Sequence, residues 1–275
     1  MNITDINPAL KEKLSMLDNW FRQRKGSIVA FSGGIDSTIV LYLARKFQGR
    51  DHAIGVISNS ESLKNKDLHL AQTVCAEFDI QLKIIKTDEL NDTRYSQNPI
   101  NRCFYCKDHL FHDLQELKHE YPGFEVLSGT NYDDLGDYRP GIDAAHKNLV
   151  LSPLVDCKIT KAEVREIAKH FGLPNWNKPA SPCLSSRIPY NQAVTIEKLK
   201  QIEAAEEILN SYGFEDVRVR HFGTFGKIEV QKDDLEKLIL IKDKIIDEIK
   251  AIGFTHIDID EEGLVSGKMN RALKD

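Results

Sequence analysis

The chain has 275 residues, of which 41% are hydrophobic and 29% are charged, and its formal net charge is −5. This composition is typical of a globular protein with one large or two modest domains. No apolar run approaches the ~20 residues that a membrane helix needs, and the acidic balance gives no overall attraction to nucleic acid. We therefore expect a cytoplasmic protein with neither a membrane nor a nucleic acid as a partner.

Short apolar runs alternate with segments of helical spacing over the first two thirds of the chain. After a helix over residues 10–24, strands are predicted over 27–31, 53–57, 82–85, 124–127 and 149–151. Helices are predicted between them over 35–47, 63–78, 107–119 and 161–171, the last with a capping box of Thr160 and Glu163. This alternation predicts an α/β fold, with a parallel sheet covered by helices on both faces. Such sheets bind ligands at the carboxyl ends of their strands.

The first predicted strand runs into the sequence Ser32-Gly-Gly-Ile-Asp-Ser-Thr38, which directly precedes a predicted helix. Glycines let backbone N–H groups approach a ligand closely, and the helix N-terminus adds partial positive charge, so the turn predicts an anion site. No lysine follows the glycines, unlike in the GxxxxGK[ST] loop of other nucleotide hydrolases. The turn resembles the SGGxDS loop of the PP-loop superfamily, whose Rossmann-like members split ATP between its α and β phosphates. The residues expected to bind pyrophosphate and Mg²⁺ are Ser32, Gly33, Gly34, Asp36, Ser37 and Thr38.

The chain has five cysteines, and this odd number argues against a framework of disulfide bonds. Cys103 and Cys106 form a CxxC pair at the start of a helix, and Cys183 follows about 80 residues later. Three converging thiolates predict a metal or iron–sulfur site, because three ligands leave one iron of a [4Fe–4S] cluster open. Zinc completed by His109 or His112 is the competing possibility. Buried, small hydrophobic roles are predicted for the other two, Cys75 and Cys157.

A stretch with four prolines over residues 173–191 interrupts the periodic pattern. Beyond it, helices are predicted over 195–212 and 235–251, and strands over 217–219, 227–230 and 255–259, which together predict a small α+β domain. The expected organisation is a PP-loop domain over 1–173, a functional linker over 174–191, and a domain over 192–275 for substrate binding and oligomerisation.

Two arginines near the start of this last domain alternate with apolar residues. Arg218 and Arg220 alternate with Val217 and Val219, so both guanidinium groups point to one face of a predicted strand. Such a pair suits a phosphate, which arginine binds through two parallel hydrogen bonds. A solvated strand face is the alternative.

Segments spread over nearly the whole chain carry a further resemblance. They are residues 31–38, 58–60, 129–131, 137–141, 152–154, 175–178, 185–190 and 217–220. Together they resemble the LarE family of ATP-dependent sulfur transferases, which build the nickel-pincer nucleotide cofactor. The most specific of them are Asp137-Tyr-Arg-Pro-Gly141 and Ser185-Ser-Arg-Ile-Pro-Tyr190.

The resemblance implies a two-step reaction on a pyridinium-3,5-biscarboxylic acid mononucleotide. A carboxylate would be adenylylated by ATP and then converted into a thiocarboxylate, with release of pyrophosphate and AMP. Some members sacrifice one cysteine, whereas members with three cysteines resembling Cys103, Cys106 and Cys183 hold a [4Fe–4S] cluster that can relay sulfide. This chain matches the second group, so ATP, Mg²⁺ and the cluster are its expected cofactors. The family also implies a hexamer, without indicating the sulfur donor.

The resemblance further assigns roles to single residues. Asp36 and the three cysteines are the expected catalytic residues. Ser58 and Ser60 would face the nucleoside, and Gly129 and Asn131 would approach the adenylate. The residues expected to bind the substrate are Arg139, Arg187, Glu206, Arg218 and Arg220. Structural salt bridges are the alternative for Arg139 and Arg187, and an exposed helix carboxylate is the alternative for Glu206.

Three other functions would use part of this pattern. A tRNA-thiolating PP-loop enzyme also combines the loop with three cysteines, but it would need a basic face. An amide-forming nucleotide synthase would leave the cysteines unexplained. A non-catalytic adenine-nucleotide sensor with structural zinc at the CxxC pair would bind ATP without releasing pyrophosphate, so pyrophosphate release distinguishes it from an enzyme.

Overall fold

The computed structural model describes residues 7–136, 138–265 and 267–273. The chain forms two compact units. Unit 1 comprises Met1–Tyr95 and Asn101–Ser181, and unit 2 comprises Ser96–Ile100 and Pro182–Asp275. The domain boundaries predicted at residues 173 and 191 stay predictions. Among the helices of the described ranges, none has the length and hydrophobicity of a membrane-spanning segment.

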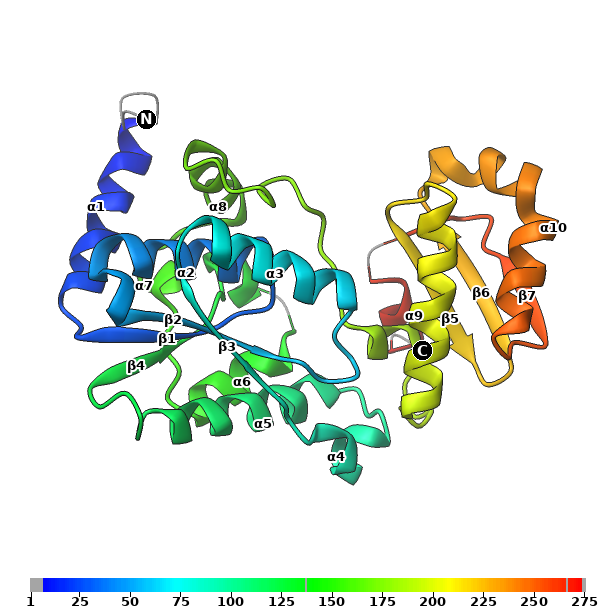
Figure 1. Ribbon diagram of the computed structural model, residues 1–275, viewed down its shortest axis with the longest axis horizontal. Coiled ribbons are helices and arrows are strands. Elements are labelled where there is room, and N and C mark those ends of the chain that lie inside the picture. Colours follow the sequence, from blue (N-terminus) through cyan, green and yellow to red (C-terminus); the bar gives the residue numbers. More distant parts are fainter. Residues whose placement is uncertain (1–6, 137, 266, 274–275) are drawn as a thin grey trace. The chain divides into compact units, whose positions relative to one another are not determined.

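Unit 1 is built on a parallel sheet of four strands in the order β3-β2-β1-β4 (Figure 1). The strands are β1 (Gly26–Ala30), β2 (Ala53–Ser58), β3 (Gln81–Ile85) and β4 (Phe124–Leu127). The chain adds β2 and β3 on one side of β1 and then returns to place β4 on the other side. The strand order therefore reverses between β1 and β4, which is the position where open α/β sheets bind ligands.

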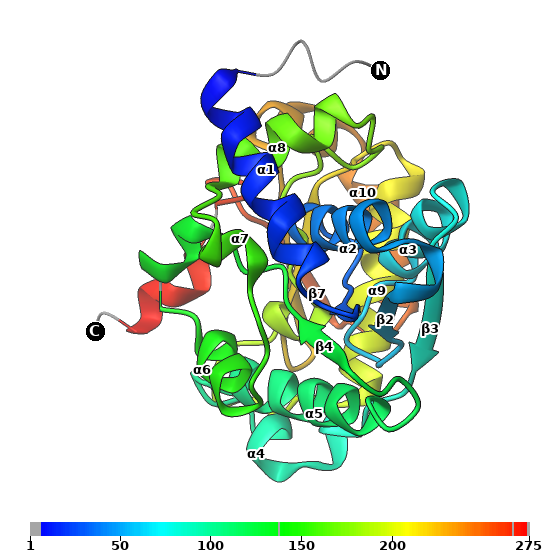
Figure 2. The ribbon, with the colours of Figure 1, turned by 90° about the vertical axis from the view of Figure 1, so that its left-hand side faces the viewer.

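Helices cover both faces of this sheet, which confirms the predicted α/β class (Figure 2). One face packs against α1 (Pro8–Arg22), α2 (Ile35–Gln48), α3 (Asn65–Glu77), α7 (Pro153–Asp156) and α8 (Lys161–His170). The other face packs against α5 (Arg102–Leu117) and α6 (Pro140–Lys147). Ile28 and Val29 of β1 belong to opposite cores, as expected for a strand buried on both sides.

Two predicted elements of unit 1 differ from the structure. The helix expected over 107–119 begins earlier, at Arg102. The strand expected over 149–151 is wrong, since only one residue, Leu151, forms a bridge to β4. Leu149 has a φ of 53° and a side chain that is 79% exposed, so the backbone is not extended there. The short helices α4 (Thr93–Ser96), α6 and α7 were not predicted.

Unit 2 has a sheet of three strands in the order β5-β6-β7 (Figure 1). The strands are β5 (Val217–Phe222), β6 (Phe225–Val230) and β7 (His256–Ile259), and the helices are α9 (Ile196–Ser211) and α10 (Leu235–Ala251). This arrangement confirms the predicted small α+β region. The apolar side of the sheet packs against α9 and α10. Since side chains alternate along a strand, the opposite side carries the charged residues Arg218, Arg220, Lys227 and Glu229.

Candidate active site

The loop after β1 is held in shape by its own hydroxyl groups. The Ser32 N–H donates to Ser37 Oγ at 3.2 Å, and Ser37 Oγ and Thr38 Oγ1 donate to the Gly34 carbonyl at 3.0 and 2.9 Å. Gly33 has a φ of +70°, and a Cβ there would lie 2.9 Å from a backbone oxygen of α3. Because the hydroxyls bond the loop itself, its backbone N–H groups at the helix N-terminus are the groups best prepared for an anion.

The loop after β4 lies directly against the N-terminus of α2. A Cβ on Gly129 would lie 2.6 Å from the Ser37 nitrogen, so only glycine allows this approach. Asn131 is 2% exposed and donates from Nδ2 to Asp36 Oδ1 at 3.1 Å. The structure thus brings together predicted site residues from the ends of β1 and β4, where the strand order reverses.

Asp36 also contacts a residue that the sequence did not single out. The Nζ of Lys161, the first residue of α8, lies 2.5 Å from Asp36 Oδ2. Asp134 lies next to this pair, accepting from the Asn131 N–H at 3.0 Å and pairing with Arg139 at 2.8 Å. Burial, reinforced by the nearby Asp36 carboxylate, raises the pKa of Asp134 above its ordinary value, although the Asn131 N–H and Arg139 oppose this. Asp36 offers the hard oxygen ligands that Mg²⁺ prefers, and Lys161 adds a cation beside them.

Arg139 has the structural salt bridge that the sequence left open as its alternative, and its side chain is 51% exposed. It belongs to the segment 137–141 that carried part of the resemblance. Residue 137 of that segment lies outside the described residues. The predicted contact between Arg139 and the substrate stays a prediction.

Asn175, in the proline-rich stretch, supports the loop Ser32–Thr38 through hydrogen bonds. Its Nδ2 donates to the Gly33 carbonyl at 3.1 Å and to Thr38 Oγ1 at 2.8 Å, and the residue is 2% exposed. Asn175 Oδ1 is buried and accepts no hydrogen bond from the described residues. The segment 175–178 contributed to the family resemblance, but nothing in the sequence indicated that it supports the loop.

The same stretch is also anchored to α3. Asp67, which is 5% exposed, accepts from Lys178 Nζ at 2.7 Å and from Ser181 Oγ at 3.0 Å. Residues 175–181 are therefore bonded to both the loop and α3 just before the chain passes into unit 2. Cys183 follows two residues later and is exposed.

Ser58 is the last residue of β2, the neighbour of β1 in the sheet, and Ser60 follows two positions later. Their hydroxyls contact neighbouring hydroxyls, Ser58 with Thr87 at 2.6 Å and Ser60 with Ser62 at 3.0 Å. They therefore lie at the expected edge of the sheet. Their contact with a nucleoside stays a prediction.

Cys103 and Cys106 lie in the first two turns of α5, where Cys103 is exposed and Cys106 is half-buried. Thiols near a helix N-terminus ionise more readily and bind metals as thiolates. Within the described parts of the chain, no group of three or more His, Cys, Asp or Glu side chains is placed to hold a metal ion. Two thiols one helical turn apart fit two ligands of a metal or cluster. Cys183 belongs to unit 2, so the convergence of three thiolates stays a prediction.

The remaining cysteines are confirmed as buried residues. Cys75 and Cys157 are each 3% exposed. Burial raises the pKa of Cys75 to about 12 and, with a smaller effect of the Asp156 carboxylate, that of Cys157 to about 11. Both thiols therefore stay protonated and unreactive near neutral pH. His109, a competing zinc ligand, contacts Asp92 Oδ2 through Nε2 at 2.9 Å.

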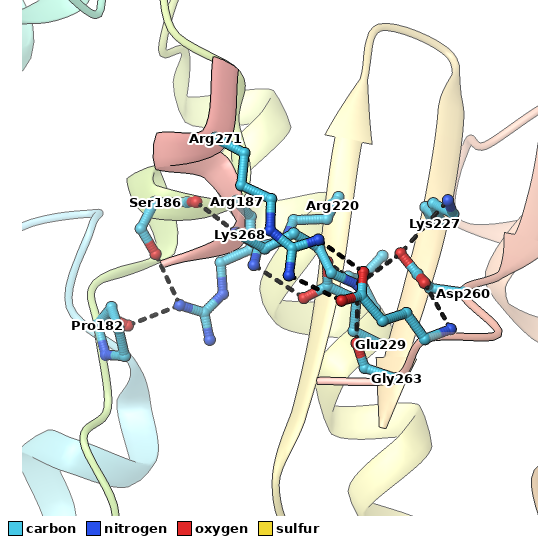
Figure 3. A network of polar contacts seen from close by, with 12 residues as sticks. Pro182, Ser186, Arg187, Arg220, Lys227, Glu229, Asp260, Gly263, Lys268 and Arg271 are labelled. Carbon is cyan, nitrogen blue, oxygen red and sulfur yellow. Dashed lines mark hydrogen bonds and ion pairs between the residues drawn. The ribbon is translucent and has the colours of Figure 1, made fainter. Parts of the chain in front are cut away.

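In unit 2, Arg187 and Glu206 form a buried ion pair. Arg187 Nε lies 2.7 Å from Glu206 Oε1, and the two side chains are 1% and 4% exposed. The alternative prediction of an exposed carboxylate at position 206 is therefore wrong. Arg187 has the structural salt bridge that was the alternative to its contact with the substrate. Arg187 also donates to the Pro182 carbonyl at 2.8 Å (Figure 3). It donates to the Cys183 carbonyl at 3.2 Å as well, which holds the segment around that cysteine.

The two arginines of β5 differ in their surroundings. Arg220 pairs with Glu229 at 2.8 Å, and its buried Nε has no hydrogen-bond partner among the described residues. Arg218 is half-buried and forms no ion pair within the described ranges. Burial, together with the charges of Arg187 and Arg220, lowers its pKa. Glu229 and Glu206 oppose this effect without outweighing it, so Arg218 is a partly buried cation that suits an anionic group such as a phosphate.

Known proteins resemble this chain over most of its length. Residues 7–102 match the NAD synthase family. An uncharacterized protein of Synechocystis sp. is 38% identical over 96% of this chain and 99% of its own length. An uncharacterized protein of Methanocaldococcus jannaschii is 34% identical over 91% of this chain and 96% of its own. The pyridinium-3,5-bisthiocarboxylic acid mononucleotide synthase of Lactiplantibacillus plantarum is 34% identical over 89% of each chain. With a PP-loop at the end of β1 and this extent of similarity to the synthase, the chain belongs to the LarE family of ATP-dependent sulfur transferases.

Proposed function

We propose that this enzyme converts a carboxylate of pyridinium-3,5-biscarboxylic acid mononucleotide into a thiocarboxylate during biosynthesis of the nickel-pincer nucleotide cofactor. The observation that carries the proposal is the loop Ser32–Thr38, which meets Gly129 and Asn131 where the strand order reverses. Similarity to a synthase named for the corresponding pyridinium-3,5-bisthiocarboxylic acid mononucleotide supports the assignment.

The first step would transfer AMP to the substrate. A carboxylate oxygen attacks the α-phosphorus of ATP, the bond from that phosphorus to the bridging oxygen breaks, and pyrophosphate leaves. The loop N–H groups and the N-terminus of α2 would stabilise the charge on the leaving group. Asp36 would hold Mg²⁺, which neutralises phosphate charge, and Lys161 would add a second cation.

The second step would replace AMP by sulfur. A sulfur nucleophile attacks the activated carbonyl carbon, the bond from this carbon to the AMP oxygen breaks, and the thiocarboxylate forms. Cys103, Cys106 and Cys183 would hold a [4Fe–4S] cluster, which when bound would supply sulfide through the iron that no cysteine holds. The hydrogen bonds from Arg187 to the carbonyls of Pro182 and Cys183 would keep the third thiol in a defined position.

The substrate phosphate would bind to Arg218 and Arg220. This assignment is supported by two observations on the described residues, among which Arg218 forms no ion pair and the buried Nε of Arg220 has no hydrogen-bond partner. Arg139, Arg187 and Glu206 are kept as proposed substrate-region residues, the last two acting through their ion pair. We further propose a cytoplasmic location, where ATP is available, and a homo-hexamer that takes no nucleic acid as a partner.

The test is an anaerobic assay with ATP, Mg²⁺, sulfide and the dicarboxylate mononucleotide. We expect pyrophosphate release that depends on the mononucleotide, and a product mass that corresponds to replacement of one carboxylate oxygen by sulfur. No pyrophosphate release with this substrate would contradict the proposal. Release with tRNA, or with a nucleotide carboxylate and ammonia, would instead support a tRNA-thiolating or amide-forming enzyme.

The cluster is tested by metal content and the visible spectrum. We expect about four irons and a band near ~400 nm in the wild type, both lost in Cys183→Ala. Cys157→Ala is the matched control, because that thiol is buried and should leave both signals unchanged. Zinc alone, or no metal, would contradict the cluster and point to structural zinc or to the sacrifice of a cysteine. In the latter case, turnover would remove one sulfur from the protein mass.

A further inference from the structure

The C-terminal segment of the chain contacts the charged side of the sheet in unit 2. After β7 the chain turns, with the Gly263 N–H donating to the Asp260 carbonyl at 3.0 Å and the Leu264 N–H donating to the Val230 carbonyl at 2.7 Å. The 3-10 segment Lys268–Leu273 follows. Figure 3 shows Lys268 within a network of carboxylates that reaches Arg220.

Lys268 is held by four oxygen atoms at one end of this network. Its Nζ lies 2.8 Å from the Gly263 carbonyl, 2.9 Å from Asp260 Oδ2, 3.4 Å from Glu262 Oε2 and 3.8 Å from Glu229 Oε1. Its side chain is only 13% exposed. Burial tends to raise the pKa of Asp260, but hydrogen bonds from Lys268, the Glu262 N–H and Lys227 outweigh it and lower this pKa. Lys268 is therefore a fixed ammonium group at the base of the charged face.

Glu229 connects this lysine to the arginines. One carboxylate oxygen pairs with Arg220 at 2.8 Å, and the other faces Lys268 at 3.8 Å. The Glu229 side chain is 1% exposed, so water screens its negative charge only weakly. A carboxylate shared with a second cation compensates Arg220 less completely, which leaves the arginine more able to attract an anion. Arg220 also donates to the Ser186 carbonyl at 2.8 Å, which limits its movement.

We infer that Lys268 is a positioning residue for the phosphate subsite and sets the preference of the enzyme for a phosphorylated substrate. It acts through Glu229 by fixing that carboxylate and by sharing its charge, so that Arg220 and Arg218 present positive charge to the phosphate. Lys268 itself does not touch the substrate. The inference rests on the proposed function, because it assumes that these arginines bind the phosphate of the mononucleotide.

The first measurement establishes the subsite independently of Lys268. Binding of ribose 5-phosphate is measured by calorimetry for the wild type and for Arg218→Ala. We expect binding that the variant loses. If the wild type does not bind this probe, or if Arg218→Ala binds it equally well, the phosphate subsite of the proposed function fails, and the inference about Lys268 fails with it.

The second measurement tests the lysine. In Lys268→Gln, which removes the charge but retains a donor for the Gly263 carbonyl, we expect KM for the mononucleotide to rise about tenfold with unchanged kcat. The same variant should bind ribose 5-phosphate about tenfold more weakly. The kinetic constants for the nucleoside without phosphate should not change, and Lys268→Arg should restore the wild-type KM. Lys242→Met, which removes a lysine exposed on α10, is the control and should leave KM unchanged.

Two results would overturn the inference while leaving the proposed function intact. One is an equal loss of activity with the phosphorylated and unphosphorylated substrates, which indicates a structural role alone. The other is a KM in Lys268→Gln no higher than in Lys242→Met. If Lys268→Gln does not fold, Lys268→Arg is the deciding variant. Because it retains the positive charge, it should bind ribose 5-phosphate with wild-type affinity. A lowered affinity of Lys268→Arg would contradict the inference.

Discussion

The loop after β1 and the arginine face of unit 2, formed by Arg187, Arg218 and Arg220, both suit an anion, but they are built from different interactions. Apart from the ion pair of Asp36 with Lys161, the loop relies on neutral hydrogen bonds between residues close in sequence, completed by Asn175. The arginine face relies on buried ion pairs, such as Arg187 with Glu206. Neutral backbone donors need no partner charge, whereas buried charges are costly unless each one is compensated. The difference predicts that single substitutions will destabilise the arginine face more than the loop.

The largest expected effect is the loss of a buried charge. Glu206→Gln leaves Arg187, which is 1% exposed, without its carboxylate, and we expect the free energy of unfolding to fall by about 3–5 kcal/mol. Urea unfolding measures this change. Glu207→Gln is the matched control, since Glu207 is exposed on the same helix and should change stability by less than about 0.5 kcal/mol. Equal effects of the two substitutions would show that the buried pair adds nothing.

The next effect is a loss of stability in acid that originates in unit 2. His221 is 1% exposed, and burial, with a smaller effect of the Lys198 charge, lowers its pKa from 6.5 to about 4. The unfolded chain therefore takes up a proton that the folded chain resists. The stabilising effect of the neutral form is complete above pH 6.5 and is lost as the pH falls towards 4, by about 3 kcal/mol.

Urea unfolding at several pH values checks this expectation. His221→Gln should flatten the pH dependence between pH 6.5 and 4. His256→Gln, at a site where the side chain is 63% exposed on β7, should leave the dependence as it is in the wild type. A dependence that survives in the His221 variant would assign the acid sensitivity to other groups.

A smaller effect is expected at the loop. Asn175→Ala removes the donor to the Gly33 carbonyl and to Thr38 Oγ1, which we expect to cost about 1–3 kcal/mol of stability. ATP binding should weaken, because the Gly33 carbonyl is no longer fixed by a hydrogen bond from Asn175. Calorimetry with ATP and urea unfolding measure the two effects. Asn177→Ala, at an exposed position in the same stretch, should change neither. Unchanged ATP affinity in Asn175→Ala would mean that the loop holds its own shape.

The smallest expected effect is the loss of stability when a helix cap is removed, which can be compared between equivalent caps in the two units. Thr160 and Glu163 form the predicted capping box of α8, which is confirmed, and Thr195 caps α9 through the Lys198 N–H. Replacing either threonine by alanine should cost about 1 kcal/mol, since each loses one capping hydrogen bond. Thermal unfolding of both variants measures this. A much larger loss in one unit would show that its cap also supports tertiary contacts.

The sequence by itself determined the features that depend on neighbouring residues. Apolar runs and helical spacing predicted the α/β order, the glycines and hydroxyls of Ser32–Thr38 predicted the loop, and Thr160 with Glu163 predicted a helix start. Burial of Cys75 and Cys157 also followed from their residue type. These properties have short periods or fixed spacings, so they can be read along the chain without knowledge of the fold.

Only the tertiary structure decided which distant side chains meet. Lys161 contacts Asp36 across 125 positions, and Asn175 contacts Gly33 across 142. Glu229 and Lys268 likewise lie far apart in sequence and meet on one face of a sheet. Such pairs leave no periodic signal, because a lysine, asparagine or glutamate suits many exposed positions equally well. Their roles follow from burial and from the partners that the fold brings within hydrogen-bonding or ion-pairing distance.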